Sequence, residues 1–536
     1  MKQLLAVALA LTAAPALAQT APPPKLVVVV SVDQFSADLF AEYRGQFREG
    51  FARLLSGGVF PSGYQSHGAT ETCPGHSTIL TGARPARTGI IGNDWMDFSV
   101  PREDKTVNCS EDPTVPGSTS KSYTVSPKNL KVSTLGEWMK LADPASRVVS
   151  VAGKDRAALM MGGHKTDELW WISGKTFTSF ADRAMPEMVA KANRSIETRL
   201  ATAREPMELP AFCQARSRAI SVGGGKTVGT WRFDRAAGDL TAFRLSPEYD
   251  EAVFDLATDF ATGMKLGQGA STDLLIVGAS VTDYIGHQLG TRGSEMCLQM
   301  MALDHSLGQF FAALDKTGVD YSVVLTADHG GLDLPERTSE DGSAGGERVD
   351  RALNAGVMGK EIAAKLGLTA PVLHGGSFGD IYADPKLTLA QRKAVLAEAT
   401  ARYTAHPQIR AVYTKEQVAA TPKPKGPPDT WSLLEELSQS YYSATSGDLL
   451  VVLQPRVTPL VDPVKGAVAT HTSGWAYNRR VPILFWRKGM TGFEQPLSVE
   501  TVDIAPTLAA MLHIPVPVEI DGKCLDLDSG PGDSCK

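Results

Sequence analysis

Three apolar runs, each followed closely by acidic or histidine residues, constrain the fold of this chain most strongly. The runs are Lys25 to Val32, Asp273 to Ala279 and Tyr321 to Thr326. They are rich in β-branched residues without polar alternation, the pattern of strands buried on both faces of a parallel sheet. Ligands bind in open α/β sheets at the carboxyl ends of the strands. We therefore expect the residues after these runs to meet at one edge of a sheet.

Helical patterns separate or follow the apolar runs, including Cys297 to Leu314 and Gln391 to Tyr403. A further strand, Val481 to Trp486, lies close to the helix-like Asp503 to Leu512. The sequence thus predicts an α/β fold with a central, mostly parallel sheet flanked by helices. The core is discontinuous in sequence, because the last strand comes from near the C-terminus.

The first eighteen residues, MKQLLAVALALTAAPALA, predict a signal peptide. A lysine precedes an apolar stretch of roughly a dozen residues, and Ala16-Leu17-Ala18 fits a cleavage site with small residues. A membrane span needs roughly 20 apolar residues, and we find no such run in the mature chain. We expect a soluble protein that is exported to a periplasm or secreted.

Export makes disulfides the expected state of the six cysteines. Cys524 and Cys535 flank a short Gly/Asp/Ser-rich loop, which makes their pairing the favoured one. Connectivity does not follow from sequence, so two weaker pairings stay open: Cys213 with Cys297, and Cys73 with Cys109.

With 536 residues, the chain exceeds the roughly 250–300 residues that one hydrophobic core usually serves. We expect a discontinuous catalytic domain over residues 19–536, with cap insertions at about 97–131 and 169–249 and an additional α/β portion at about 332–463. The net charge of −6 argues against a nucleic-acid-binding surface. We favour a monomer, although the oligomeric state stays open.

Six residues close to the ends of these runs, or in a later loop, are of the types that bind zinc. Asp283 and His287 stand one helical turn apart, and two neighbours follow another apolar run in TADHGG. Taken singly, each acidic residue has a plain alternative as a helix cap or turn residue. Their joint occurrence favours two ions roughly 3.5–4 Å apart, a pair that can clamp an in-line displacement. The first ligand set is Asp283, His287 and His471, and the second is Asp33, Asp328 and His329.

The segment GATETCPGHSTILTG offers hydroxyl groups in a Gly/Pro turn that opens a helical pattern at Ser77 to Leu80. A helix N-terminus favours an anion, so this is a suitable place to present a nucleophile to phosphate. Thr70, Thr72, Ser77 and Thr78 are all possible by spacing. The alternative role of N-cap suits Ser77 or Thr78, and His76 is expected to support the turn.

Three further residues carry donors of the kind that bind phosphoryl oxygens. Asn93 lies in IIGNDW, and Lys154 and Arg156 lie in SVAGKDRAA. Ordinary surface positions are the alternative for these residues.

Seven motifs, in order along the chain, resemble the alkaline phosphatase superfamily, and specifically its single-threonine alkaline phosphatases related to type I phosphodiesterases/nucleotide pyrophosphatases. The resemblance runs from about Lys25 to about Leu512 and rests on VVVVSVDQ, ATETCPGHSTILTG, IIGNDW, SVAGKDRAA, SVTDYIGH, TADHGG and ATHTSGW. Cys73, directly after the threonine of the second motif, departs from relatives that often have a smaller residue there.

The resemblance implies that Thr72 is the nucleophile and also a metal ligand. It implies two zinc ions, the first held by Asp283, His287 and His471 and the second by Asp33, Asp328, His329 and Thr72. It further implies that Asn93, Lys154 and Arg156 contact the phosphate. Relatives that prefer diesters lack the Lys-x-Arg pair, so its presence favours monoesters.

The expected function is therefore an exported, zinc-dependent alkaline phosphatase, a phosphoric monoester hydrolase that works through a phosphothreonine. Its expected partners are small phosphate esters and inorganic phosphate. The nearest alternative is a phosphodiesterase or nucleotide pyrophosphatase with the same metals. A non-catalytic binding protein is a more distant alternative.

Overall fold

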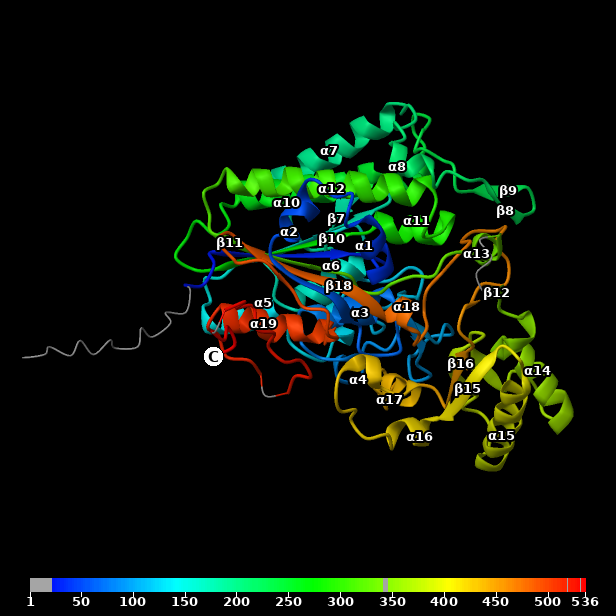
Figure 1. Ribbon diagram of the computed structural model, residues 1–536. Coiled ribbons are helices and arrows are strands. Elements are labelled where there is room, and N and C mark those ends of the chain that lie inside the picture. Colours follow the sequence, from blue (N-terminus) through cyan, green and yellow to red (C-terminus); the bar gives the residue numbers. More distant parts are fainter. Residues whose placement is uncertain (1–21, 341–345, 518, 531) are drawn as a thin grey trace, which may run out of the picture.

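The computed structural model describes residues 22–340, 346–517, 519–530 and 532–536, so the predicted signal peptide lies outside the described residues. A ten-stranded sheet forms the centre of this described part (Figure 1). From one edge to the other its strands are β19 (Phe493–Glu494), β2 (Gly58–Tyr64), β18 (Arg480–Arg487), β11 (Tyr321–Thr326), β1 (Leu26–Val32), β10 (Asp273–Ala279), β5 (Val148–Ala152), β6 (Glu168–Ser173) and β7 (Thr176–Thr178), with β20 (Val499–Glu500) paired to β2.

The three apolar runs are the adjacent central strands of this sheet. β1 lies between β10 and β11 and is parallel to both, and β5 and β6 continue the parallel part. β18, β2 and β7 each run antiparallel to a neighbour. The prediction of a mostly parallel sheet completed from near the C-terminus is confirmed.

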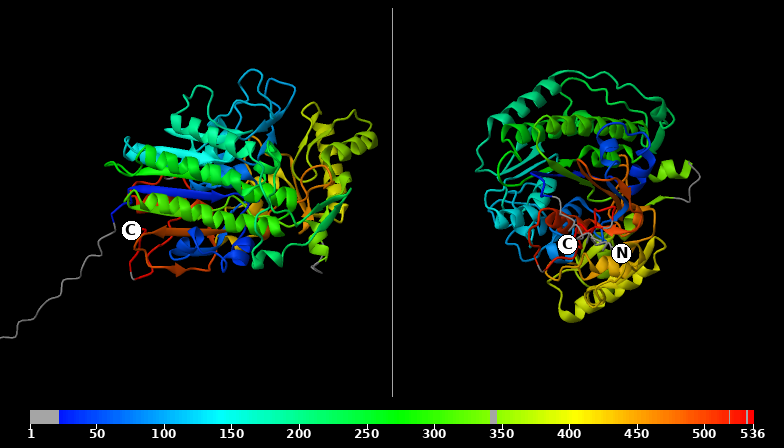
Figure 2. Two further views of the ribbon diagram at one scale, coloured as in Figure 1. Left: turned by 90° about the horizontal axis from the view of Figure 1, so that it is seen from above. Right: turned by 60° about the vertical axis from the view of Figure 1, so that its left-hand side comes forward.

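Helices cover both faces of the sheet, and β1 shows why its sequence lacks alternation. Val28 and Val30 pack into the core on one face, while Val27 and Val29 pack into the core on the other. All four side chains are fully buried, and each contributes roughly 1.5 kcal/mol or more by leaving water. Figures 1 and 2 show the two helical layers. One contains α7 (Glu187–Ala201), α10 (Pro247–Gly263) and α12 (Ser294–Asp315); the other contains α3 (Thr72–Ile79), α5 (Leu135–Ala142), α6 (Asp155–Gly162) and α19 (Ile504–Met511).

The predicted helices are confirmed, with ends that differ by a few residues. The pattern at 297–314 is α12, that at 503–512 is α19, and that at 391–403 is α15 (Leu389–Ala405). α15 begins with a capping box between Thr388 and Gln391, a local signal that fixes its start.

A second, four-stranded antiparallel sheet lies within residues 332–463. Its order is β13 (Leu373–Gly375), β14 (Gly379–Ala383), β16 (Leu449–Leu453) and β15 (Ile409–Thr414). With α14 (Ala355–Leu366) and α15 it encloses a separate hydrophobic core. It lies at the lower right in Figure 1, beyond the main sheet.

The other two long segments differ in how they join the main body. Residues 97–131 contain β4 (Thr106–Asn108), which forms a hairpin with β3 (Asp94–Met96). The start of 169–249 lies in the sheet, because β6 and β7 form its edge, and α7 then packs on α10.

All six cysteines are paired, and the three pairs are those considered from the sequence. Cys524 bonds to Cys535, Cys213 to Cys297, and Cys73 to Cys109. The pair Cys213–Cys297 ties segment 169–249 to α12. No helix among the described residues combines the length and the apolar character that crossing a membrane requires.

Candidate metal centre

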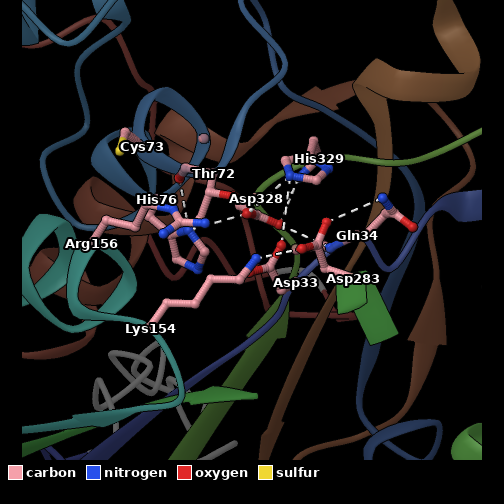
Figure 3. A network of polar contacts seen from close by, with 12 residues as sticks. Asp33, Gln34, Thr72, Cys73, His76, Lys154, Arg156, Asp283, Asp328 and His329 are labelled. Carbon is pink, nitrogen blue, oxygen red and sulfur yellow. Dashed lines mark hydrogen bonds and ion pairs between the residues drawn. The ribbon is translucent and has the colours of Figure 1, made fainter. Parts of the chain in front are cut away.

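The candidate residues meet at the carboxyl ends of the central strands. Asp33 directly follows β1, Asp328 lies just after β11, and Asp283 lies in the first turn of α11 (Val281–Leu289), which follows β10. All three carboxylates are almost fully buried. Lys154, which follows β5, extends toward them from the neighbouring strand (Figure 3).

The alternative role of Asp33 as a helix cap does not apply. Helix α1 (Ala37–Tyr43) is capped by Ser36, whose side chain accepts from the amide of Leu39. Neither Asp33 oxygen has a hydrogen-bond partner among the described residues, although Oδ2 forms an ion pair with Lys154. A buried carboxylate of this kind is costly without a cation.

The start of helix α11 is held by a buried carboxylate from another helix. Asp250 in α10 accepts hydrogen bonds from the amides of Ser280 and Val281 at 2.7 and 3.2 Å, and from Gln299 Nε2 at 3.0 Å. These bonds satisfy helix-end donors that would otherwise be orphaned. They fix the helix that carries Asp283 and His287, whose Oδ1 and Nε2 lie 3.2 Å apart.

Three histidines are oriented in the same way, by a backbone carbonyl at Nδ1. The contacts are His287 to Ala469 O at 3.0 Å, His329 to Gly330 O at 2.9 Å and His471 to Thr70 O at 2.7 Å. Since a carbonyl oxygen only accepts, we assign the proton to each Nδ1. Each Nε2 then presents a lone pair, the arrangement typical of histidines that bind metals.

These Nε2 atoms and the carboxylates form two overlapping groups with the spacing of metal ligands. One group is Asp283, His287 and His471, the first set expected from the sequence. The other is Asp33, Asp283 and His329. Asp283 thus belongs to both groups. The sequence analysis instead assigned Asp328 to the second group. Asp328 Oδ2 nevertheless lies 3.3 Å from His329 Nε2.

The electrostatics of this cluster fit a divalent cation. Burial, reinforced by Asp283 and Asp328, raises the pKa of Asp33 well above its usual range. Lys154 Nζ supplies the balancing charge, 2.6 Å from Asp33 Oδ2 and 2.5 Å from Asp283 Oδ2. His471 Nε2 and His287 Nε2 lie only 3.2 Å apart. Histidine nitrogens and carboxylate oxygens this close together are the ligand atoms that zinc and similar metals prefer.

The proposed nucleophile turn lies against this cluster, at the N-terminus of α3. The helix begins at Thr72, earlier than expected, so the alternative of Ser77 or Thr78 as N-cap is wrong. Both hydroxyls instead donate to carbonyls within the helix, Ser77 to Pro74 and Thr78 to Gly75. The earlier start places Thr72 in the first turn, where the helix dipole favours an anion.

Close approach of α3 to the strand end depends on Gly75. A Cβ atom at this position would lie 1.9 Å from the carbonyl oxygen of Asp328. His76 also ties the two segments together, with Nδ1 2.8 Å from Thr72 O and 3.1 Å from Asp328 Oδ2. His76 therefore supports the turn, as expected.

The three predicted phosphate-binding residues lie around the same turn. Asn93 Oδ1 accepts from the amide of Cys73 at 2.9 Å, and the Asn93 amide donates to Glu71 at 2.5 Å. Figure 3 shows Arg156 extending toward Thr72 and Lys154 extending toward Asp33 and Asp283. Burial opposes the charge on Arg156, yet its neighbour Asp155 and more distant anionic groups raise its pKa. Both cations are thus held charged near the N-terminus of α3.

Two residues of the centre have no signal in the sequence. Gln34 donates from Nε2 to Asp283 Oδ1 at 3.1 Å and from its amide to Asp328 Oδ1 at 3.0 Å. Asp250 resembles any other polar residue of an amphipathic helix. Both roles depend on which segments the fold brings together.

The chain is similar to known proteins over most of its length. A sequence model of the family described as type I phosphodiesterase / nucleotide pyrophosphatase matches residues 27–474. The chain is 54% identical over 521 residues to alkaline phosphatase PhoK of Sphingomonas sp, covering 96% of this chain and 93% of that protein. It is 46% identical over 517 residues to alkaline phosphatase PhoD of Zymomonas mobilis, covering 95% and 89%.

A solved structure extends the likeness to the fold. The crystal structure of wild-type alkaline phosphatase PafA superposes with a TM-score of 0.81 at 25% identity, covering 94% of this chain and 99% of that chain. The similarity therefore spans the main sheet, the second sheet and the segments between them.

Proposed function

The chain belongs to the type I phosphodiesterase/nucleotide pyrophosphatase family of the alkaline phosphatase superfamily, and on this premise we propose that it is an exported, zinc-dependent alkaline phosphatase. The observation that carries the proposal is the meeting of two candidate metal groups at Asp283 beside the N-terminus of α3. The nearly full-length relatives named alkaline phosphatases support hydrolysis of phosphate monoesters.

Two zinc ions fit the donor set, one with Asp283, His287 and His471, the other with Asp33, Asp328, His329 and the Thr72 hydroxyl. When bound, such ions supply Lewis-acid charge that lowers the pKa of a hydroxyl and stabilises developing negative charge. The backbone carbonyls at the three Nδ1 atoms hold the histidines in the required tautomer.

Thr72 is the nucleophile in the first of two displacements and the leaving group in the second. In the first, the Thr72 hydroxyl loses its proton to solvent and a bond forms between Thr72 Oγ and phosphorus. The ester bond breaks, and its electron pair leaves with the alcohol oxygen, which takes up a proton from solvent. In the second, a water oxygen bonds to phosphorus and the Thr72 bond breaks, which releases inorganic phosphate and restores the hydroxyl. A phosphothreonine separates the two steps.

Asn93, Lys154 and Arg156 bind and orient the non-bridging phosphate oxygens. Lys154 then exchanges part of its contact with the carboxylates for contact with phosphate. A monoester carries one more negative charge than a diester, so two fixed cations favour the monoester.

The domain organisation stays a proposal of the same kind. We propose one discontinuous catalytic domain over 19–536, in which segments 97–131, 169–249 and 332–463 shape access to the centre. The predicted signal peptide, together with the three disulfides, supports export.

The decisive test is kcat/KM for p-nitrophenyl phosphate and bis-p-nitrophenyl phosphate on one zinc-loaded preparation, with a chelated sample as control. A strong monoester preference that chelation abolishes supports the proposal. A diester preference would assign the chain to phosphodiesterase chemistry instead. No turnover of either ester would favour a non-catalytic binding protein.

A further inference from the structure

A cavity of about 450 Å³ lies between the candidate metal centre and the second sheet. One wall includes the sequence neighbours of three site residues: Glu71 beside Thr72, Asp94 beside Asn93, and Thr472 beside His471. The opposite wall comes from β14 and β16 of the second sheet. The cavity therefore lies where the alcohol part of a bound phosphate ester can extend.

Four aromatic side chains are part of the cavity lining. Trp95, Phe378, Tyr382 and Trp475 all line it. Two of them have their polar ends occupied elsewhere, since Trp475 Nε1 donates to Leu453 O at 3.2 Å and Tyr382 Oη donates to Thr445 O at 2.9 Å. Their hydrocarbon surface is thus what an occupant meets. Such walls suit an apolar body and, through the ring faces, a cation.

Every ionisable side chain that lines the cavity among the described residues is a carboxylate, apart from the tyrosine: Glu71, Asp94 and Asp380. Glu71 accepts from the Asn93 amide and Asp94 accepts from Asn108, and both lie in the field of Arg156.

Asp380 differs from the other two carboxylates. Its Oδ1 accepts from the amide of Gly447 at 2.6 Å, and no lysine, arginine or histidine in the described part of the chain forms an ion pair with it. Burial raises the pKa of Asp380 to about 6, so it is charged at alkaline pH. An anionic alcohol group would be repelled here, and a neutral one would leave this charge unbalanced.

We propose that this cavity binds the alcohol part of a phosphate monoester whose apolar or aromatic body carries a positively charged ammonium nitrogen. The inference rests on the proposed function, because it names the substrate class of the same site. The phosphate group meets Lys154 and Arg156, while the ammonium group meets Asp380 and the aromatic faces. The substrate is thus a zwitterion whose two charges match the two ends of the site.

Two matched esters test the proposal. One is the phosphate ester of a phenol with a trimethylammonioethyl group para to the oxygen. The other is its neutral isostere, in which carbon replaces the quaternary nitrogen. The charge lies away from the ester bond, so the two leaving groups have similar reactivity. Asp380→Asn should lower kcat/KM for the cationic ester about tenfold and change that for the neutral ester less than about twofold.

A second variant and a control keep the test decisive. Phe378→Leu keeps an apolar wall but removes a ring face, so it should also reduce turnover of the cationic ester selectively. Asp350→Asn is the matched control, because Asp350 also accepts a backbone amide, from Ala352, but does not line the cavity. It should leave both esters unaffected. Equal losses for both esters, or no loss with either variant, would overturn the proposal.

Failure of the proposed function gives a different result. If the wild-type protein hydrolyses neither ester nor p-nitrophenyl phosphate, the phosphatase assignment fails. Calorimetric binding of the free cationic phenol to wild type and Asp380→Asn then still decides the role of the cavity. Binding about tenfold weaker in the variant supports it, and equal or absent binding refutes it.

Discussion

Lys154 Nζ lies 2.5 Å from Asp283 Oδ2, and both side chains are almost fully buried. The same nitrogen lies 2.6 Å from Asp33 Oδ2, so one ammonium group balances two carboxylates, one just after β1 and one in the first turn of α11. A residue expected to bind phosphate therefore also neutralises two candidate metal ligands. The positive charge of Lys154 therefore stabilises these carboxylates most when no metal ion is bound.

Lys154→Met should destabilise the metal-free protein by about 3 kcal/mol, because it leaves two buried carboxylates without their cation. With zinc, the loss should shrink below about 1 kcal/mol. Urea unfolding in chelator and in zinc measures both values. Lys128→Met, which removes an exposed pair with Asp112, is the control and should cost at most about 1 kcal/mol in either buffer. An equal loss for Lys154→Met in both buffers would contradict this role.

Thr72→Ala should abolish turnover, by about 10⁴-fold or more, while zinc content and binding of inorganic phosphate persist. Acid quenching of the wild type with radiolabelled ester should trap label on the peptide that contains Thr72. Label on the peptide of the variant, or turnover near the wild-type rate, would show that another group is the nucleophile.

Lys154→Ala with Arg156→Ala should reduce kcat/KM for p-nitrophenyl phosphate about 10³-fold, since the monoester dianion loses two fixed cations. The loss for bis-p-nitrophenyl phosphate should stay within about tenfold. Parallel assays on one zinc-loaded preparation give the ratio. Losses of equal size for the two esters would rule out the charge argument.

Asp250 should make stability fall as the pH rises. Burial, which outweighs its hydrogen bonds, raises the pKa of Asp250 to about 7 in the folded chain, against about 4 in an unfolded chain. Between these values the folded state binds more protons, so raising the pH lowers the free energy of unfolding. Asp250→Asn removes this titration. The unfolding free energy of the wild type minus that of the variant should therefore fall from about pH 4 to pH 7, as measured by urea unfolding in chelator. A constant difference would refute it.

Gly75→Ala should displace α3 from the end of β11, because the new Cβ would lie 1.9 Å from Asp328 O. We expect a stability loss of about 1–3 kcal/mol and a fall of about 10²-fold in kcat/KM, since the nucleophile turn moves. Thermal unfolding and p-nitrophenyl phosphate assays measure these effects. Gly45→Ala is the control, because a Cβ there meets nothing within 4 Å. It should change neither stability nor kcat/KM. Similar losses from both variants would contradict the packing argument.

The strands buried on both faces could be predicted from sequence, because such strands are apolar along their whole length and do not alternate with polar residues. β1, β10 and β11 are continuous apolar runs. β2 gives no such signal, because it contains Pro61 and two glycines, Gly58 and Gly63. The antiparallel direction of β18 follows from pairing with β11, which no local pattern encodes.

The site could be predicted where chemistry is unusual and not where it is ordinary. Aspartates and histidines directly after buried strands stand out, and the structure brings them together. Gln34 and Asp250 carry common side chains whose partners lie far away in sequence. The start of α3 at Thr72 was also not predicted, because Pro74 and Gly75 read as a turn although proline is tolerated in the first turn of a helix.

The order of the segments in the central sheet has a consequence for biosynthesis. Asp33 directly follows β1, whereas β18 and His471 come far later in the chain, after β11 and the second sheet. A nascent chain that has been made only as far as β11 therefore lacks β18 and one member of the first candidate metal group, however well its early strands have folded. With His471 assigned to the metal centre as proposed, that centre can be completed only after the segment that carries His471 has been synthesised.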